Sequence, residues 1–553
     1  MKKAWSKGLA ILLTAGIGLT GCTSADGQDG ASADSGSQPA ADATAPGSFP
    51  IVKDKVTLKV LVTGNSLIED MNTNAFTKWL EEKTNVHIEW EVAPASNPNE
   101  KLNLVLASGD YPDVIMNFGI SPTQQLIYGQ QGVFMPLNEL IEKYGVETKK
   151  LFERYPNIKK AISAPDGKIY SLPRINENYH DLMNQKMWIY TPWLDKLGLK
   201  MPTTTEEFYQ VLKAFKTQDP NGNGIADEIP LAGAKEKAHQ PIRFLMNAFQ
   251  LDNETTSNRL IFKDGKIDVA YNKPGWKEGV AYMHKLYAEG LIAPEIYTQD
   301  RAQLKQMTEK QDAIVGTATA NIIQDMTNIA GKLNRWKDYK TVPPLKGPNG
   351  LQITPYNPYP FATGVFVITR NCKNPEIALR WADAMYNEEF TLRSVHGEPG
   401  VDWDKAAPGE IGVNGKPAKW KKLMPFGIVQ NKHWYQSTTT LQDLELRGSL
   451  YADPNIDAEK TLWDETLKNY DSYKAKVEDM VPPIFFTEQQ ASELADLEKT
   501  VNDYVEQMTT RFVTGNVSID SQWDVYVKTL ENMNLKRMLE IYNEAYTQQY
   551  KKG

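Results

Sequence analysis

Hydrophobic and polar positions follow two different periods along the chain from about residue 55 onward. A two-residue period runs through 55–65 and stops at Gly64-Asn65, which predicts a buried first strand. The next segments alternate in type: a helix over 74–85, a strand over 86–94, a helix over 97–108 that ends at Gly109, and a strand over 112–119. Strands that alternate with helices predict a mostly parallel, doubly wound α/β sheet.

Ligands of such sheets bind beyond the carboxyl ends of the strands. This rule selects Asn65 and Asn117, which come at the ends of two predicted strands, and Asn321, which lies at the end of a predicted strand of small apolar residues over 313–322. The remaining pattern predicts two helical pieces within 188–216, a helix over 274–295, a strand and a helix within 364–389, and a largely helical last ninety residues.

The first residues have the pattern of an export signal. Lys2, Lys3 and Lys7 precede an apolar run over 9–19 that is too short to span a membrane as a stable helix. The run ends in Leu-Thr-Gly-Cys, which resembles the lipobox of bacterial lipoproteins, in which Cys22 would become the first mature residue and carry lipid on its sulfur. The alternative is an ordinary signal peptide that ends near a cysteine. We therefore predict a signal peptide over 1–21, followed over 22–49 by the lipidated cysteine and a flexible tether of small and polar residues.

Composition and charge narrow the class of the folded body. Hydrophobic residues make up 41% of the chain, and no second apolar run is long enough to span a membrane, so we expect a soluble body with two or three cores. The formal net charge of −8 argues against nucleic-acid binding, which needs a basic face. Cys372 is the only other cysteine, so no internal disulfide is expected and Cys372 is interpreted as an inert structural thiol.

No pattern in the sequence points to catalysis. None of the six histidines has the helical spacing of a zinc site, and neither a Gly-x-Ser-x-Gly elbow nor a phosphate-binding loop is present. With 69 acidic residues, a pair of carboxylates brought together by the fold is compatible with the sequence, but no motif proposes one. These observations favour a binding protein over an enzyme.

A loop over 218–231 places oxygen-bearing side chains at every second position around two glycines. Asp219, Asn221, Asn223 and Asp227 occupy positions one, three, five and nine of a calcium loop, and Ile225 at position seven would offer its carbonyl. Position twelve is Pro230 rather than glutamate, so Glu228 at position ten would have to supply the last carboxylate. The alternative is a pair of Asn-Gly turns with solvated acids.

Several longer stretches, in their order along the chain, resemble one protein family. They are the lipobox, LASGDYPDVI (106–115), WLDKLGLKMPTTTEEF (193–208), the 218–231 loop, LYAEGLIAPE (286–295), FVITRNCKNPEIALRWAD (366–383), FVTGN (512–516) and WDVYVKTLENMNL (523–535). This series is similar to the extracellular solute-binding proteins of ABC importers, of the family 1 type, and within them to the large lipoprotein branch that includes alginate- and oligosaccharide-binding members.

The resemblance implies an α/β fold of two lobes with a hinge and a ligand cleft between them. Lobe one would comprise 50–175 plus about 352–405, and lobe two about 176–351 plus 406–553. The protein would be a monomer on the outer face of the bacterial cell membrane, capturing an oligosaccharide and delivering it to membrane permease subunits without bond breaking. Because oligosaccharide-binding relatives carry calcium at a matching loop, the 218–231 loop is expected to hold a structural Ca²⁺ away from the cleft.

Further candidate ligand residues are aromatic or planar polar side chains, which suit sugar faces and hydroxyls. Trp403 lies in a polar, glycine-rich loop that is a poor candidate for a core helix or strand, and the resemblance places this loop at the cleft. Trp434 and Tyr435 lie in a second polar stretch, Trp188 follows the expected hinge, and Arg174 follows a strand end at that hinge. A core position for each aromatic, or a surface ion pair for Arg174, is the alternative.

The sequence is also compatible with other functions. The same fold could bind a peptide or another small solute, and an anchored glycoside hydrolase or a surface adhesin or sensory co-receptor is a different class that the sequence does not exclude.

Overall fold

A computed structural model of the chain describes residues 43–253, 259–329, 331–424, 428–453, 455 and 457–551. The predicted signal peptide, Cys22 and most of the predicted tether lie outside these residues. The described start of the chain is held against the first lobe: the Arg380 guanidinium donates to the carbonyls of Thr44 and Ala45, and Phe49 stacks on Phe390. The folded body therefore includes 43–49, which the sequence assigned to the tether, because a distant arginine binds its backbone.

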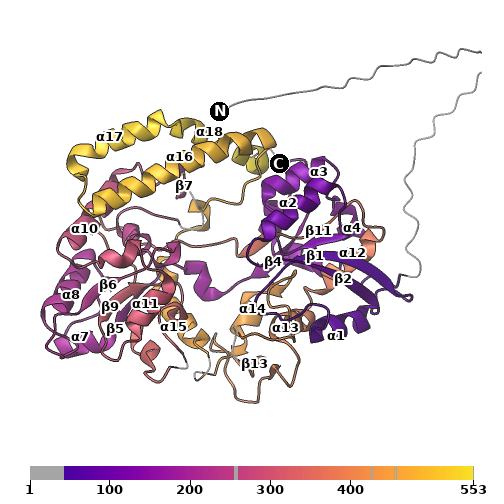
Figure 1. Cartoon of the computed structure of the whole chain (residues 1–553), viewed down its shortest axis with the longest axis horizontal. Helices are drawn as coiled ribbons and strands as arrows, with labels where there is room; N and C mark the ends of the chain where they lie inside the picture. The colour runs from indigo at the N-terminus through magenta and orange to yellow at the C-terminus, as the bar shows by residue number, and fades with distance from the viewer. Residues whose placement is uncertain are drawn as a thin grey trace, which may run out of the picture. The chain divides into compact units, whose positions relative to one another are not determined.

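The first lobe is built on a six-stranded sheet (Figure 1). β1 pairs in parallel with β2 and β3, as the sequence pattern predicts, but β11 enters antiparallel to both β3 and β4, so the sheet is mixed. The strand order is β14 (Leu441–Gln442), β4 (Leu172–Asn176), β11 (Phe361–Ile368), β3 (Val114–Met116), β1 (Val56–Thr63) and β2 (Val86–Ala93).

Helices cover both faces of this sheet. Asn74 begins the first helix, where its side chain accepts a hydrogen bond from the amide of Phe76. Trp381 and Trp434 are buried in one face of the core, whereas Tyr170 and Phe134 are buried in the other. The helices of this lobe are α1 (Ala75–Thr84), α2 (Pro98–Ser108), α3 (Pro122–Gln130), α4 (Asn138–Tyr144), α5 (Glu147–Arg154), α6 (Pro156–Ile162), α12 (Pro375–Ala384) and α13 (Glu388–His396).

The second lobe is built on a four-stranded sheet. The helical stretch predicted from residue 188 begins instead as strand β5, because Trp188 packs into the core of this sheet. Thr204 and Glu207 form a capping box at the start of α8. The strands run β10 (Tyr339–Val342), β5 (Met187–Tyr190), β9 (Val315–Thr319), β6 (Ile229–Ala232), with helices α7 (Thr191–Leu197), α8 (Thr205–Thr217), α9 (Pro241–Leu245), α10 (Pro274–Ala288), α11 (Arg301–Thr308), α15 (Glu459–Asn469) and a hairpin of β7 (Leu260–Lys263) and β8 (Lys266–Val269).

A small third sheet joins strands from the last third of the chain. It consists of β12 (Trp403–Lys405), β13 (Trp420–Lys422) and β15 (Leu450–Tyr451), with α14 (Leu444–Gly448) beside it. Trp403 opens β12, and its indole is buried with Trp420 in a core of its own. The expectation that this stretch is a loop is thus corrected, because β12 pairs with β13, a partner that local patterning does not reveal.

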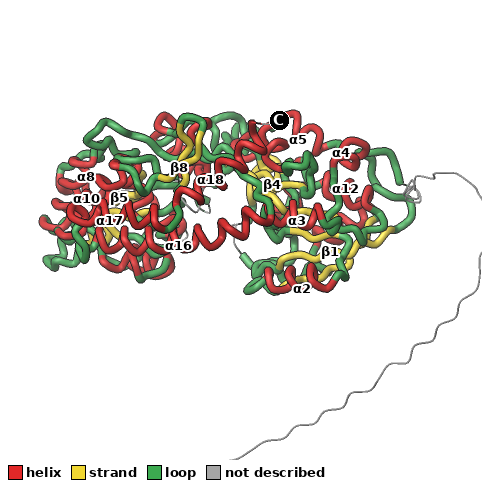
Figure 2. Tube along the Cα trace, turned by 90° about the horizontal axis from the view of Figure 1, so that it is seen from above, coloured by secondary structure: helices red, strands yellow, loops and turns green. Residues whose placement is uncertain are grey.

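The chain ends in long helices, as expected: α16 (Glu488–Val513), α17 (Ile519–Asn532) and α18 (Leu535–Tyr546). Helix α16 packs against α10, α17 and α18 and also contacts α3 of the first lobe (Figure 2). Among the described residues, no helix is both long and apolar enough to cross a membrane.

The chain passes between the two main sheets after β4 and after β10, and after β14 it returns to the second lobe as α15, which contacts β10. Strand β14 pairs with β4, with Leu441 opposite Ile175, and Trp434 is buried in the core of the first lobe. The stretch from about residue 428 to 442 therefore belongs to the first lobe, whereas the sequence-based boundary at 405 assigned it to the second. Pairing between residues so far apart in the chain explains the difference.

Candidate functional site

A cavity of about 600 Å³, called the cleft below, opens between elements of both lobes. The second lobe contributes the 3-10 helix η1 (Tyr179–Met183), the segment after β9 and the start of α15, and the other wall comes from α13, β13, α14 and the segment before β14. The cleft is lined by Asn178, His180, Asp181, Asn321, Ile322, Gln324, Ile329, Val395, His396, Lys422, Gln436, Arg447, Asn455, Asp457, Glu459 and Leu462.

A buried lysine holds one wall of the cleft in place. The ammonium of Lys186 donates to the carbonyl of His180 at 2.6 Å and to that of Met183, at the end of η1. Burial lowers the pKa of Lys186 to about 7, although nearby Asp181 favours its charged form. The two hydrogen bonds fix η1, and with it the Asp181 carboxylate, which accepts from the side-chain amides of Asn321 at 2.7 Å and Asn178 at 3.0 Å.

Cations and carboxylates lie close together in the cleft. Lys422 pairs with Asp457 at 2.8 Å, and the His180 imidazole lies 3.6 Å from the Glu459 carboxylate. Burial alone would raise the pKa of Glu459, but His180 and then Lys422 and Arg447 bring it below its ordinary value. The cleft walls thus carry cations and carboxylates close together, so neither sign of charge dominates, which favours an uncharged polar ligand.

Three polar atoms of the cleft are buried without a hydrogen-bond partner in the described part of the chain: Asn321 Oδ1, Gln324 Oε1 and Arg447 Nε. Buried polar groups are nearly always hydrogen-bonded, and an unpaired one costs about 1–3 kcal/mol. Because their residues line the cavity, small side-chain rotations would make two acceptors and one donor available to hydroxyl groups of a ligand.

The residues proposed from sequence lie at different distances from this cavity. Asn321 lines the cleft. Arg174 donates to Asn117 Oδ1 at 2.9 Å and to the carbonyl of Gln436, so this pair supports the wall to which Gln436 belongs. Asn65 caps its own turn by accepting from the amide of Leu67 and does not line the cleft.

The tryptophans proposed from sequence are buried in cores. Trp188 is completely buried and donates to the carbonyl of Ala320. Trp434 is also completely buried and donates to Thr77 Oγ1. The indole of Trp403 is buried in the third sheet and donates to the carbonyl of Gly397. None of the three lines the cleft, because polar neighbours in sequence do not prevent an indole from packing inward.

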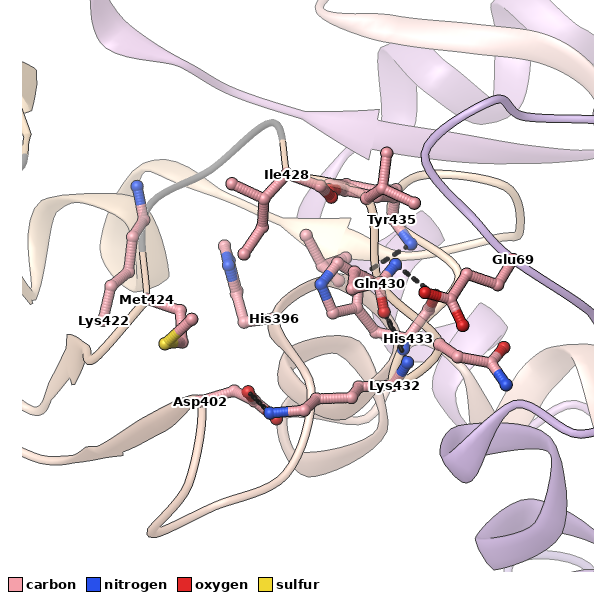
Figure 3. Close-up of a pocket in the computed structure, with 13 residues that line it drawn as sticks. Glu69, His396, Asp402, Lys422, Met424, Ile428, Gln430, Lys432, His433 and Tyr435 are labelled. Carbon is pink, nitrogen blue, oxygen red and sulfur yellow. Dashed lines mark hydrogen bonds and ion pairs between the residues drawn. The ribbon is translucent and has the colours of Figure 1, made fainter.

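A second cavity of about 370 Å³, called the annex below, is shown in Figure 3 and has three lining residues in common with the cleft. Tyr435 lines it, with a left-handed backbone at φ +53°, and its hydroxyl donates to the carbonyl of Ile428. The annex is lined by Glu69, Val395, His396, Asp402, Lys422, Met424, Ile428, Val429, Gln430, Asn431, Lys432, His433 and Tyr435.

Sequence reasoning missed most residues of the cleft. His396, Lys422, Gln436 and Arg447 come from the last third of the chain and have no motif in common. One signal was available, because His396 begins the glycine-rich stretch in which Trp403 was proposed, and His396 lines the cleft whereas Trp403 does not.

The 218–231 loop is folded as a series of side-chain-to-backbone turns. Asp219 accepts from the amides of Gly222 and Gly224, Asn221 Oδ1 accepts from the amide of Asn223, and Asn223 Oδ1 accepts from that of Ile225. The loop leads into strand β6, as expected, and not into a helix.

The donor set of this loop fits calcium. Glu228 Oε1 is buried without a hydrogen-bond partner among the described residues, and burial, followed by the nearby charges of Asp219 and Asp227, raises the pKa of Glu228. A cation would relieve this crowding of carboxylates, and all the available ligands are oxygens. No group of three or more His, Cys, Asp and Glu side chains that could hold a metal is found in the described ranges; this loop draws two of its oxygens from asparagines.

Comparison with known proteins assigns the family. The sequence profile of the bacterial extracellular solute-binding proteins matches residues 64–391, which is more than half of the chain. The chain belongs to this family. It is a solute-binding protein and not an enzyme, which excludes the alternative of an anchored glycoside hydrolase. The α/β fold of two lobes expected from the sequence is confirmed.

Two relatives of this solute-binding protein carry informative names. The fructooligosaccharide ABC transporter substrate-binding protein FusA of Streptococcus pneumoniae is 32% identical over 512 residues, covering 90% of this chain and 91% of FusA. The lipoprotein LipO of Bacillus subtilis is 29% identical over 361 residues, covering 63% of this chain and 68% of LipO.

Solved structures of FusA are similar to this solute-binding protein as well. The complex with kestose matches with a TM-score of 0.73 and 29% identity, covering 90% of this chain and 100% of FusA. An EF-hand mutant of FusA in complex with fructo-nystose matches equally well, at a TM-score of 0.73 and 29% identity over the same shares. FusA therefore contains an EF-hand, which is a calcium-binding motif.

Proposed function

We propose that this protein is the substrate-binding component of an ABC importer and that it captures an uncharged oligosaccharide in the cleft. The observation that carries the proposal is the set of unpartnered atoms Asn321 Oδ1, Gln324 Oε1 and Arg447 Nε, whose residues line one cavity between the lobes. Sugar hydroxyls can donate to the two amide oxygens and accept from the guanidinium. The similarity to FusA, whose name includes fructooligosaccharide, supports the same class of ligand. In this proposal the protein acts as a monomer and delivers its ligand to permease subunits in the membrane.

A peptide is the second candidate ligand, and the charges of the cleft distinguish it. A peptide presents an ammonium and a carboxylate, which need free charges of opposite sign, whereas Lys422 is paired with Asp457 and Arg447 lies in the field of Glu459, Asp181 and Asp457. A thermal-shift screen of kestose, maltotriose, trigalacturonate and short peptides tests this. We expect a neutral saccharide to raise the melting temperature most, and a rise with peptides alone would overturn the proposal.

The membrane anchor is proposed from the sequence and supported by the similarity to the lipoprotein LipO. A Cys22→Ser variant is expected to appear in the culture medium or the soluble fraction, because it has no sulfur to carry lipid. Cell fractionation with an antibody measures this, and the same substitution at Cys372 is the control, which should stay with the membrane. Membrane association that survives Cys22→Ser would exclude the anchor.

We propose further that Asp219, Asn221, Asn223, Asp227, Glu228 and the carbonyl of Ile225 hold a structural Ca²⁺. When bound, the ion would neutralise the facing carboxylates and stabilise the connection between α8 and β6. The support is the buried, unpartnered Glu228 Oε1 together with the all-oxygen donor set. In this position the ion would stabilise the lobe and would not contact the ligand.

Calcium is expected to raise the melting temperature of the wild type and to leave an Asp219→Ala variant unchanged, because the variant lacks the carboxylate around which the loop folds. A ligand at a hundred times its Kd adds about 2.7 kcal/mol of stability. Differential scanning fluorimetry with CaCl₂ and with EDTA measures the response. Asp195→Ala, which removes an exposed carboxylate of α7, is the matched control. Equal stabilisation of both variants would place the ion elsewhere.

A further inference from the structure

The cleft and the annex share a wall. Val395, His396 and Lys422 line both cavities, so a ligand that fills the cleft has a neighbouring cavity directly beyond these side chains. Figure 3 shows His396 between Lys422 and Met424 on one side of the annex and Gln430 and His433 on the other. Cavities of about 300–1,000 Å³ are typical of small-molecule sites, and both cavities fall in this range.

The wall between the cavities is polar but uncharged at His396. Its imidazole packs on Trp420 with ring centroids 4.8 Å apart. Burial, followed by the cations Lys422 and Arg447 and by His433, keeps the pKa of His396 well below its usual range. A neutral imidazole has one donor and one acceptor nitrogen and can bind hydroxyls that pass it.

The interior of the annex has the character of a sugar site. Val395, Met424, Ile428 and Val429 give apolar surface. The polar groups among them are fixed: Gln430 Oε1 accepts from the amide of His433 at 2.9 Å, and Lys432 pairs with Asp402 at 2.6 Å. Apolar walls with a few immobile polar groups are what oriented binding of a small polar ligand requires.

The imidazole of His433 adds a hydrogen-bond donor to the annex. The amide of Tyr435 donates to His433 Nδ1 at 3.1 Å, so the neutral ring of His433 carries its proton on Nε2. Burial lowers the pKa of His433 to about 4, despite the opposing charge of Asp402, and the ring is neutral at pH 7. The cation that lines the annex beside Asp402 is already paired with it, which leaves no free positive charge there for an acidic sugar.

We propose that the annex is a second subsite of the cleft, which takes additional uncharged sugar residues and makes the protein prefer longer oligosaccharides. This inference rests on the proposed function of the cleft. It commits to one occupant, the far end of the same ligand, because the two cavities lie on either side of the same three side chains, Val395, His396 and Lys422.

Filling the annex tests the proposal. Val429 is 60% exposed and lines the annex, so Val429→Trp should fold normally and occupy the cavity. Ile411→Trp is the matched control, since Ile411 is 49% exposed and lines neither cavity. Isothermal titration would give the Kd values of two neutral series, kestose against nystose and maltotriose against maltohexaose.

In the series that binds, we expect the wild type and Ile411→Trp to bind the longer saccharide about tenfold more tightly, a difference of about 1.4 kcal/mol. Val429→Trp should lose this preference while keeping the Kd of the shorter saccharide within about twofold. Equal Kd values for short and long saccharides in the wild type, or a preference that survives in Val429→Trp, would overturn the annex alone. If no saccharide of either series binds, the function proposed for the cleft fails, and the annex with it.

Discussion

An Asn321→Ala variant is expected to bind its oligosaccharide about 10 to 100 times more weakly than the wild type. The substitution removes Oδ1, one of the acceptors free for a ligand hydroxyl, and also the amide that donates to Asp181 at 2.7 Å. A buried polar group left without its partner costs about 1–3 kcal/mol, which corresponds to this range of Kd. Isothermal titration with the saccharide that gives the largest thermal shift measures the effect.

The control for this variant is Asn272→Ala. Asn272 Oδ1 is also buried without a hydrogen-bond partner in the described ranges, but Asn272 lines neither the cleft nor the annex. We expect its Kd to equal that of the wild type. If both variants weaken binding alike, or if Asn321→Ala binds normally, the free acceptor of Asn321 does not recognise the ligand.

Trp434→Ala is expected to destabilise the protein by about 3–5 kcal/mol and to leave the affinity of the folded protein unchanged. The indole is completely buried among Phe76, Trp90 and Trp381, with ring centroids 4.7, 5.1 and 5.9 Å away. Its removal would leave a cavity that the rigid helix and sheet around it cannot close. Urea unfolding measures the loss, and titration below the unfolding transition measures the Kd.

Trp434→Phe provides the comparison, because it keeps most of the aromatic packing and loses only part of the volume and the hydrogen bond to Thr77. Its stability should lie between those of the wild type and Trp434→Ala. A Trp434→Ala protein that is as stable as the wild type but no longer binds the ligand would show that this tryptophan faces the ligand and not the core.

Local patterns were sufficient for several elements of the first half of the chain, although not for strand β5. The period-two strand at β1, the Asn74 cap of α1, the glycine after α2 and the Thr204–Glu207 capping box depend on residues close in sequence. The strand-end rule also brought Asn321 to the cleft wall, because β9 belongs to a sheet whose edge faces that cavity.

Features that depend on distant pairing could not be predicted. Strand β11 enters the first sheet antiparallel, β14 pairs with β4, and β12 pairs with β13, and none of these leaves a local period. The tryptophans were misjudged for the same reason: the polar stretch around Trp434 says nothing about the apolar partners that the fold brings from residues 76, 90 and 381. His396 and Arg447 escaped notice because a charged or polar side chain has no sequence mark that distinguishes a cleft from a surface.

A crystal structure of the protein with its most stabilising neutral saccharide would test the function most directly. We expect sugar hydroxyls within hydrogen-bonding distance of Asn321 Oδ1, Gln324 Oε1 and Arg447 Nε, between the two lobes. A saccharide bound elsewhere on the protein, with these three atoms still unpartnered or satisfied by water alone, would contradict the assignment of the cleft as the ligand site.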